Sequence, residues 1–412
     1  MPDKDISVAD YQRVEKEESR VSSSKPELSV VLPCLNEADT LAVCIEQAKR
    51  GLEENGINGE IIVADNGSTD GSLEIAERSG VRVVHVKDKG YGNALMSGIE
   101  AARSQYVLMG DADDSYDFLE IPNYVAKLDE GYDLVMGCRL ASGGGTVLPG
   151  AMPFLHRWWG NPMFSWMARL WFGSPLNDVH CGMRAFRKDF YKGIDQRCTG
   201  MEFATEMTIK ASLYGYKITE IPITLRPDGR KSRAPHLKTF RDGWRHLRLY
   251  LMYTPRWLFL LPGIALILLG LIGYAVALPN LTLNIFGKPI RFDVHTLLFA
   301  SLFLLSGFQI LWFAFFTKVF AISAGLLPQD SRLEKLFAHV NLERGLILSG
   351  GGLLIGLVLL GLAFNDWRLT GFGDLDYAKT MRLVIPGATL TALSVQAIFS
   401  SFFASILGMK RK

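Results

Sequence analysis

The sequence predicts an α/β domain with a mostly parallel sheet, followed by an amphipathic interfacial helix and an all-α membrane domain of four transmembrane helices. Short apolar runs alternate with helix-like segments as far as residue 137, which is typical of doubly wound sheets. From Trp257 onward the chain consists mainly of long uncharged stretches. The 44 Lys and Arg nearly balance the 42 Asp and Glu, and the resulting net charge of +2 argues against a nucleic-acid-binding protein.

The expected domain boundaries follow these changes in composition. Residues 1–27 are charged and lack the apolar segment of a signal peptide, so we expect a flexible tail. Residues 28–234 form the α/β domain, residues 235–256 an amphipathic juxtamembrane segment, and residues 257–412 the membrane domain. The five cysteines are widely spaced and include no CxxC pair, which is typical of free thiols in a reducing cytosol.

Five strands and four helices are expected in the α/β domain. The strands are Leu28–Leu32, Glu60–Ala64, Val81–Val86, Tyr106–Met109 and Leu134–Gly137, and the helices are Thr40–Leu52, Thr69–Arg78, Gly92–Arg103 and Phe118–Leu128. Polar sequences follow the strands, where the ligands of such sheets bind. The sequence has no GxGxxG after the first strand and no Walker A loop, which disfavours a dinucleotide enzyme and a P-loop NTPase.

Four uncharged segments are each long enough to cross a bilayer as a helix. They lie at about 257–279, 294–317, 345–365 and 383–407. Lys and Arg are dense before the first segment and form the last three residues of the chain. By the positive-inside rule, this distribution predicts an integral membrane protein with the α/β domain and both termini in the cytoplasm.

The segment before the first span has its own pattern. Phe240, Trp244, Leu247 and Leu251 recur at helical spacing among basic residues. This pattern is typical of a helix that lies in the headgroup plane of a membrane. An ordinary amphipathic linker helix fits the same pattern equally well.

The acidic sequence at the end of the fourth strand indicates a cation site. Asp111 and Asp113 follow Tyr-Val-Leu-Met, and an Asp-rich turn can direct both carboxylates into one crevice. Such a pair suits a divalent cation, Mg²⁺ or Mn²⁺, that also holds a diphosphate. An isolated Asp-x-Asp is usually a solvated loop, but the polar clusters after the first two strands favour a site here.

In this order and spacing, PCLNE, DNGSTDGS, KGYGNA and GDADD resemble the motifs of family 2 glycosyltransferases, which have the Rossmann-like GT-A fold. The sequences GCR, DVHCGMRAF, GMEFATEM and RPDGRKSR resemble the branch that makes polyprenyl-phosphate sugars, such as dolichyl-phosphate mannose and glucose synthases. The resemblance covers about Glu27 to Tyr253. It implies an inverting enzyme that transfers a hexose from a UDP- or GDP-sugar to a polyprenyl phosphate for cell-envelope or protein glycosylation, with a homo-oligomer as one option.

The resemblance also implies roles for individual residues. Those on the donor side are Pro33, Glu37 and Asp65 for the nucleoside, Lys89 and Asp114 in the substrate site, and Arg226 and Ser232 closing over the donor. Asp111 and Asp113 would serve the metal and the donor diphosphate, with Asp113 catalytic. Arg139 and Arg184 would be the catalytic groups that hold the lipid phosphate. Leu35 stands where the family usually has Tyr, which argues against an aromatic contact with the base. Ser115 stands where many members have Gln, and Asp114 would compensate for that metal ligand.

Several alternatives remain at the level of the sequence. Arg139 could pair with Asp133, and Arg184 with Asp178, in purely structural roles. A membrane-bound polysaccharide synthase shares the fold, but its Gln-x-x-Arg-Trp motif does not occur here. A non-catalytic lipid-sugar flippase or scaffold is a third option, although nearly uncharged spans offer little material for a polar path.

Overall fold

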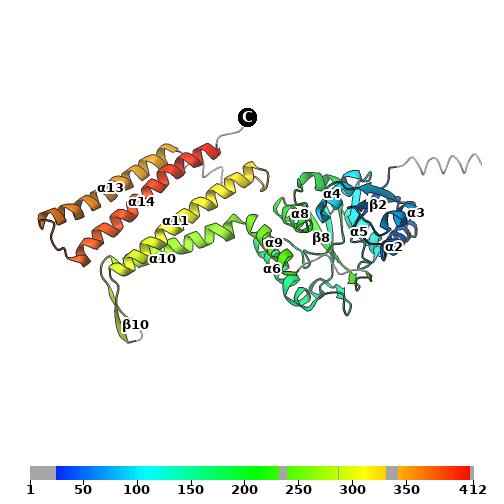
Figure 1. Cartoon of the computed structure of the whole chain (residues 1–412), viewed down its shortest axis with the longest axis horizontal. Coiled ribbons are helices and arrows are strands. Elements are labelled where there is room, and N and C mark those ends of the chain that lie inside the picture. The colour runs from blue at the N-terminus through cyan, green and yellow to red at the C-terminus, as the bar shows by residue number, and fades with distance from the viewer. Residues whose placement is uncertain (1–24, 232–238, 286, 331–341, 409–412) are drawn as a thin grey trace, which may run out of the picture. The chain divides into compact units, whose positions relative to one another are not determined.

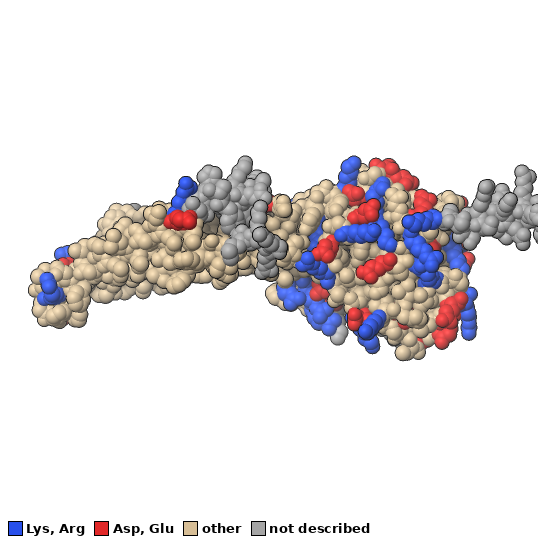
Figure 2. Space-filling model, turned by 90° about the horizontal axis from the view of Figure 1, so that it is seen from above, with Lys and Arg blue, Asp and Glu red and all other residues tan. Residues whose placement is uncertain are grey.

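The structure is a computed structural model that describes residues 25–231, 239–285, 287–330 and 342–408. Nearly all of the predicted N-terminal tail lies outside these residues. The chain forms two compact units, Met1–Leu249 and Tyr250–Lys412, called unit 1 and unit 2 below (Figure 1). Figure 2 shows charged side chains spread over unit 1, whereas the visible surface of unit 2 is almost entirely uncharged.

Unit 1 is built on one large sheet. Among the described residues it has seven strands in the order β3-β2-β1-β4-β7-β5-β8. They are β1 (Leu28–Cys34), β2 (Gly59–Asp65), β3 (Arg82–His85), β4 (Tyr106–Met109), β5 (Leu134–Cys138), β7 (Arg184–Arg187) and β8 (Ile218–Pro222). All neighbours are parallel except β7, which is antiparallel to both β4 and β5. The mostly parallel sheet predicted from the sequence is therefore confirmed, with β7 and β8 as additional strands.

Helices pack on this sheet through apolar stripes. The predicted helices correspond to α2 (Leu41–Glu53), α3 (Ser72–Arg78), α4 (Tyr91–Ala101), and the short 3₁₀ turn η1 (Phe118–Glu120) with α5 (Ile121–Asp129). In α2, Leu41, Cys44, Ile45 and Ala48 are buried at helical spacing. At Gly98 of α4 a Cβ atom would lie 2.5 Å from a Val31 methyl group, so a side chain there would separate α4 from the sheet.

The remaining elements of unit 1 were not predicted, except α9 (Thr239–Met252), which is the helix expected in the juxtamembrane segment. A π-helical turn, η3 (His156–Gly160), leads into α6 (Asn161–Phe172), followed by α7 (Lys188–Gly193), α8 (Phe203–Leu213) and α9, whose last residues belong to unit 2. The 3₁₀ turn η2 (Ala141–Gly143) precedes a two-residue ladder between β6 (Thr146–Val147) and β9 (Thr224–Leu225). This ladder directs the segment after β9 back towards the end of β4, where the Arg226 amide donates to the Ser115 carbonyl at 3.0 Å.

Unit 2 has, among its described residues, four helices that are long and apolar enough to cross a membrane, as predicted. The spans are Arg256–Ala277, which joins the π-helical turn η4 (Arg256–Leu260) to α10 (Leu261–Ala277), then α11 (Val294–Ser323), α13 (Leu342–Leu369), and Tyr377–Leu407 within α14 (Tyr377–Gly408). Small residues bring these helices together: at Gly270 of α10 a Cβ atom would lie 2.7 Å from Leu304 of α11. A hairpin of β10 (Thr282–Ile285) and β11 (Lys288–Arg291) after the first span was not predicted.

Candidate active site

Two loops at the carboxyl ends of β1 and β2 are joined by hydrogen bonds. The Asn36 amide donates to Ser68 Oγ, and the Glu37 amide to Ser72 Oγ, both at 2.9 Å. The buried Asp65 carboxylate accepts the amides of Gly67 and Ser68 at 3.0 Å each, which holds the β2 loop in a tight turn. Asp65 and Glu37 therefore lie, with the half-buried Pro33, at the sheet edge where parallel strands bind ligands.

The loop after β4 presents the aspartates that were predicted as metal ligands. Asp111 accepts a hydrogen bond of 2.9 Å from the Tyr91 hydroxyl, and Asp113 accepts one of 3.1 Å from the Ser115 amide. Burial, and then the nearby charge of Asp113, raise the pKa of Asp111 to about 6. Asp114 turns away with a φ of 59° and accepts a hydrogen bond of 3.0 Å from Gln47.

The carboxylates of this loop are ligands that fit a hard divalent cation. The described residues contain no group of three or more His, Cys, Asp or Glu side chains able to hold a metal. Mg²⁺ is commonly bound by one or two carboxylates and completes its shell with substrate phosphates and water. The pair Asp111 and Asp113, whose mutual repulsion raises the Asp111 pKa, matches that arrangement because a cation between them would relieve the repulsion.

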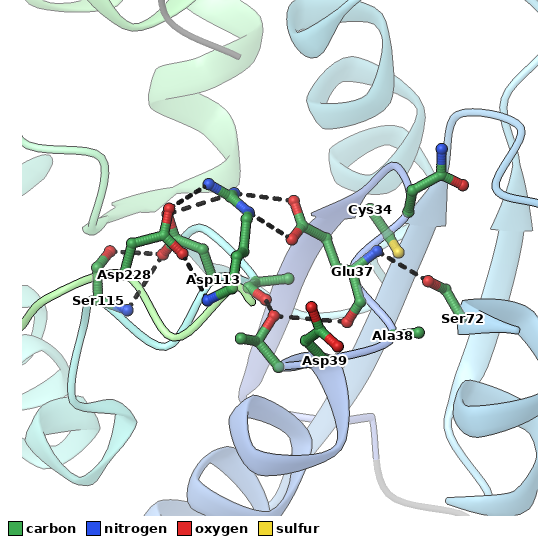
Figure 3. Close-up of polar contacts among 12 residues, drawn as sticks. Cys34, Glu37, Ala38, Asp39, Ser72, Asp113, Ser115 and Asp228 are labelled. Carbon is green, nitrogen blue, oxygen red and sulfur yellow. Dashed lines mark hydrogen bonds and ion pairs between the residues drawn. The ribbon is translucent and has the colours of Figure 1, made fainter. Parts of the chain in front are cut away.

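Arg230, which was not among the predicted site residues, forms ion pairs with Glu37, Asp113 and Asp228. Figure 3 shows these three carboxylates close to one another. The Arg230 guanidinium binds Glu37 with two bonds of 2.7 and 2.9 Å and Asp228 with one of 2.7 Å. Its Nη2 also lies 3.3 Å from Asp113 Oδ2. Although burial opposes the charge, the hydrogen bonds that Arg230 donates to Glu37 and the negative charge of Asp113 raise the pKa of Arg230 further above its usual value. Arg230 is part of RPDGRKSR, so the sequence contained a signal for it.

The other predicted donor-side residues lie around this centre. The exposed Lys89 precedes α4, and the next amide, that of Gly90, donates to Asn66 Oδ1 at 2.8 Å, which joins this turn to the β2 loop. Arg226 forms an ion pair with Asp117 beside the β4 loop. Ser232 lies outside the described residues.

The structure shows the partners of Arg139 and Arg184, the two arginines predicted to hold the lipid phosphate. Arg139 does not pair with Asp133: its Nε and Nη2 donate to the two oxygens of the buried Asp178 at 2.7 and 2.9 Å. Asp178 is therefore not the partner of Arg184. Arg184 is fully buried on β7 and donates to the carbonyls of Ala204 and Cys181 at 2.7 and 2.5 Å. Burial lowers the pKa of Arg184, an effect that the charge of the nearby Asp111 partly offsets.

We call Arg139 and Arg184 the cationic region, and two histidines that the sequence did not assign lie beside it. The rings of His180 and His246 lie 4.7 Å apart, and His246 Nδ1 is 2.8 Å from Thr205 Oγ1. Burial, together with the positive groups His246 and Arg139, holds the pKa of His180 well below its usual range. Burial therefore favours the neutral form of both histidines beside the two arginines.

The chain is similar to several known proteins. A crystal structure of glucosyl-3-phosphoglycerate synthase from Mycobacterium tuberculosis with Mn²⁺, UDP and glucosyl-3-phosphoglycerate is 21% identical, with a TM-score of 0.44 over 61% of this chain and 85% of that chain. The dolichyl-phosphate hexose transferase of Haloferax volcanii is 31% identical over 201 residues, 48% of this chain and 83% of that protein.

The evidence for the family covers both units. Residues 29–194 match the model for glycosyl transferase family 2, and residues 315–408 match the model for the glycosyltransferase family 2 C-terminal transmembrane region. The low-salt glycan biosynthesis hexosyltransferase Agl6 of Haloferax volcanii is 37% identical over 388 residues, 94% of this chain and 90% of that protein. On the extent of these matches, the chain belongs to glycosyltransferase family 2, as an integral membrane member with a GT-A Rossmann-like catalytic domain.

Proposed function

We propose that this glycosyltransferase moves a hexose from a UDP- or GDP-sugar to a polyprenyl phosphate and inverts the configuration of the anomeric carbon. The observation that carries the proposal is that an acidic region and the cationic region lie at the same edge of the sheet. The acidic region is Asp111 and Asp113 after β4, and the cationic region is Arg139 after β5 and Arg184 at the start of β7. Arg184 on β7 pairs in register with Met109, two residues before Asp111, and a Cβ atom added at Gly182 would lie 2.5 Å from Asp111 Oδ2. A donor diphosphate with its metal suits the first region, and an anionic acceptor suits the second.

The donor side needs groups that bind a nucleotide and a metal. Glu37 and Asp65 would bind the nucleoside, because both lie buried at the ends of β1 and β2 and Asp65 is already fixed by two amides. Asp111 and Asp113 would hold Mg²⁺ or Mn²⁺, which when bound supplies positive charge to the leaving diphosphate. Arg230 lies beside the same carboxylates, so its guanidinium is within reach of that diphosphate.

The acceptor side needs charge more than it needs a base. A phosphate monoester has a second pKa of about 6, so at neutral pH it is already a nucleophile. The requirement is to offset its repulsion from the donor diphosphate, and arginine forks do this for phosphates. Asp178 engages two of the five N–H groups of Arg139, which leaves donors directed elsewhere for a phosphate.

The names of two relatives also support a lipid-linked product. One is a dolichyl-phosphate hexose transferase and the other a glycan biosynthesis hexosyltransferase. The Lys and Arg bias supports a cytoplasmic catalytic unit with both termini on the same side. Such an enzyme would supply lipid-linked hexose to cell-envelope or protein glycosylation.

The test is a product analysis with the purified full-length protein in lipid nanodiscs. The protein is incubated with a panel of UDP- and GDP-sugars, Mg²⁺ or Mn²⁺ and a short polyprenyl phosphate, and products are identified by mass spectrometry. We expect one polyprenyl-phosphate hexose and stoichiometric nucleoside diphosphate, both absent with Asp113→Asn. A growing polysaccharide would instead identify a synthase, and lipid-sugar binding without any turnover would identify a flippase or scaffold.

A further inference from the structure

Tyr91, the first residue of α4, contacts the metal-site loop from another element. Its hydroxyl donates a hydrogen bond of 2.9 Å to Asp111 Oδ1, across 20 residues of sequence. In the part of the chain that the structure describes, this is the one hydrogen bond that the Asp111 carboxylate accepts. Asp113 differs, because its carboxylate is held by the Ser115 amide of its own loop and by Arg230. The orientation of Asp111 therefore depends on a residue outside its loop.

Gly182 confines the other oxygen of the same carboxylate. A Cβ atom at Gly182 would lie 2.5 Å from Asp111 Oδ2, so a residue with a side chain does not fit there. The Gly182 amide also donates to the Tyr116 hydroxyl at 2.9 Å, which holds the two segments together. An ionised carboxylate has about four lone-pair positions, so the single bond from Tyr91 leaves Asp111 able to bind a cation.

The turn before α4 is joined to the β2 loop, which limits where Tyr91 can lie. Asn66, the buried residue after β2, makes two hydrogen bonds to this turn. Its Oδ1 accepts the Gly90 amide at 2.8 Å, and its Nδ2 donates to the Asp88 carbonyl at 2.9 Å. Gly90 directly precedes Tyr91, so the backbone that carries the Tyr91 side chain is fixed to the loop that begins after Asp65.

The segment before α8 holds the start of α4 as well. A Cβ atom at Gly92 would lie 2.6 Å from the Cys198 carbonyl oxygen, so the two backbones are in direct contact. Glu206 accepts a hydrogen bond of 2.6 Å from the Cys198 amide and pairs with Lys210 at 2.9 Å. The Glu206 and Lys210 side chains are at most 1% exposed. A buried charge pair therefore fixes the segment against which the first turn of α4, with Tyr91, is packed.

A tyrosine hydroxyl is well suited to support a carboxylate that binds a metal. It is a neutral donor at neutral pH, so it orients the carboxylate without repelling a cation. Arg230 is the opposite case, since its positive charge lies 3.3 Å from Asp113 and opposes a cation there. Mg²⁺ demands near-ideal octahedral geometry, which favours ligands whose orientation is already fixed. Hydrogen-bond partners of metal ligands typically contribute about ten- to a hundredfold to metal affinity.

We propose that Tyr91 is a positioning residue of the metal site, whose hydroxyl holds Asp111 in the orientation that binds the divalent cation. Tight metal binding would then require an ordered first turn of α4. The proposal rests on the metal site of the proposed function, and it concerns affinity for the cation rather than the transfer step. The competing role for the Tyr91 hydroxyl is purely structural, with an effect on stability alone.

The test is calorimetric titration of the full-length protein with Mn²⁺, in nanodiscs of zwitterionic phospholipid. We expect Tyr91→Phe to bind Mn²⁺ about ten- to a hundredfold more weakly than the parent protein. Tyr106→Phe is the matched control, because the Tyr106 hydroxyl also donates to an aspartate, Asp129, at 2.9 Å, but from the opposite end of β4. This control should bind Mn²⁺ as the parent does. Equal affinity in Tyr91→Phe and the parent would overturn the proposal, as would equal losses in both variants.

Two further measurements separate positioning from an effect on the fold. Thermal unfolding in EDTA should give similar midpoints for Tyr91→Phe and Tyr106→Phe, since each loses one partly buried hydrogen bond. In turnover assays, Tyr91→Phe should need at least about tenfold more Mn²⁺ for half-maximal rate and should reach the parent rate at saturation. A much lower midpoint for Tyr91→Phe, or a lower saturated rate with an unchanged Mn²⁺ requirement, would contradict a positioning role.

Asp113→Asn tests the metal site itself. We expect this variant to lose the Mn²⁺ binding of the parent protein. If the parent bound no Mn²⁺, or if Asp113→Asn bound it equally well, the metal site of the proposed function would be wrong and the role of Tyr91 with it. Binding that is lost in Asp113→Asn but unchanged in Tyr91→Phe would refute only the role of Tyr91.

Discussion

At the residue scale, the most informative placement is that of Arg230. Its positive charge lies among Glu37, Asp113 and Asp228, carboxylates that would otherwise repel one another. A divalent cation on Asp113 would meet this guanidinium as a competitor for the same oxygens. We therefore expect a cation on Asp113 to displace Arg230 from that carboxylate.

Replacing Arg230 should make the site a better metal site in the absence of nucleotide. We expect Arg230→Ala to tighten Mn²⁺ binding by about tenfold, since removing a repulsion of about 1.4 kcal/mol has that effect on a binding constant. Calorimetric titration of the full-length protein with Mn²⁺ measures this directly. Lys231→Ala is the matched control, because it removes the same charge from an exposed position in the same loop. Unchanged or weaker binding in Arg230→Ala would show that the guanidinium does not compete with the metal.

The buried pair of Arg139 and Asp178 should be important for stability. Asp178→Asn removes the charge opposite a guanidinium that is only 9% exposed, and breaking such a pair typically costs about 3–5 kcal/mol. We expect a clear fall in the midpoint of thermal unfolding, followed by intrinsic fluorescence. Asp195→Asn, which breaks the exposed pair with Arg197, should change the midpoint little. If the two variants behave alike, the Arg139 charge is compensated by other groups.

At the element scale, the start of α4 is held against the segment that precedes α8. Gly90 has a φ of 143°, and a Cβ atom there would lie 2.6 Å from the Thr199 carbonyl oxygen. The Asn93 amide donates to that same oxygen at 3.2 Å. This close approach brings Lys89 and Tyr91, on either side of Gly90, next to the β2 and β4 loops.

Gly90→Ala should therefore loosen this contact. The left-handed backbone costs a residue with a side chain about 1–3 kcal/mol, and the clash with Thr199 adds to that. Gly131→Ala is the control, because Gly131 also has a positive φ, of 93°, but no atom lies within 4 Å of its added Cβ. We expect the lower unfolding midpoint for Gly90→Ala. A larger effect at Gly131 would mean that strain, and not the contact, dominates.

At the scale of the whole molecule, the large sheet, its helices and the candidate site lie within unit 1. We predict that residues 1–249, produced alone in mild detergent, bind UDP or GDP with Mn²⁺. Detergent is needed because Trp158, Trp159 and Trp166 are each more than half exposed. Since ligand that binds only the folded state stabilises it, nucleotide should raise the unfolding midpoint. A shift seen only with the full-length protein would mean that residues of unit 2 are needed for donor binding.

The sequence by itself determined the features that depend on local pattern. Strands such as Leu28–Cys34 and Tyr106–Met109 are short apolar runs, and the spans are long uncharged stretches, so both could be read from neighbouring residues. The carboxyl ends of those strands also located Asp65, Asp111 and Asp113 at one edge of the sheet. The last three predicted spans were shorter than the helices, since helices continue beyond the bilayer core, whereas the first, 257–279, nearly matches Arg256–Ala277.

Tertiary structure decided the features that join distant residues. Strand β7 has only four residues, two of them arginine, and its antiparallel place between β4 and β5 satisfies their backbones rather than any local pattern. Arg139 finds Asp178 across 39 residues, and Arg230 finds Glu37 across 193. Helix α6 is apolar on two faces, so its periodicity could not tell which face the fold buries. Local sequence records what one segment prefers, whereas charge pairing and burial depend on which segments the sheet brings together.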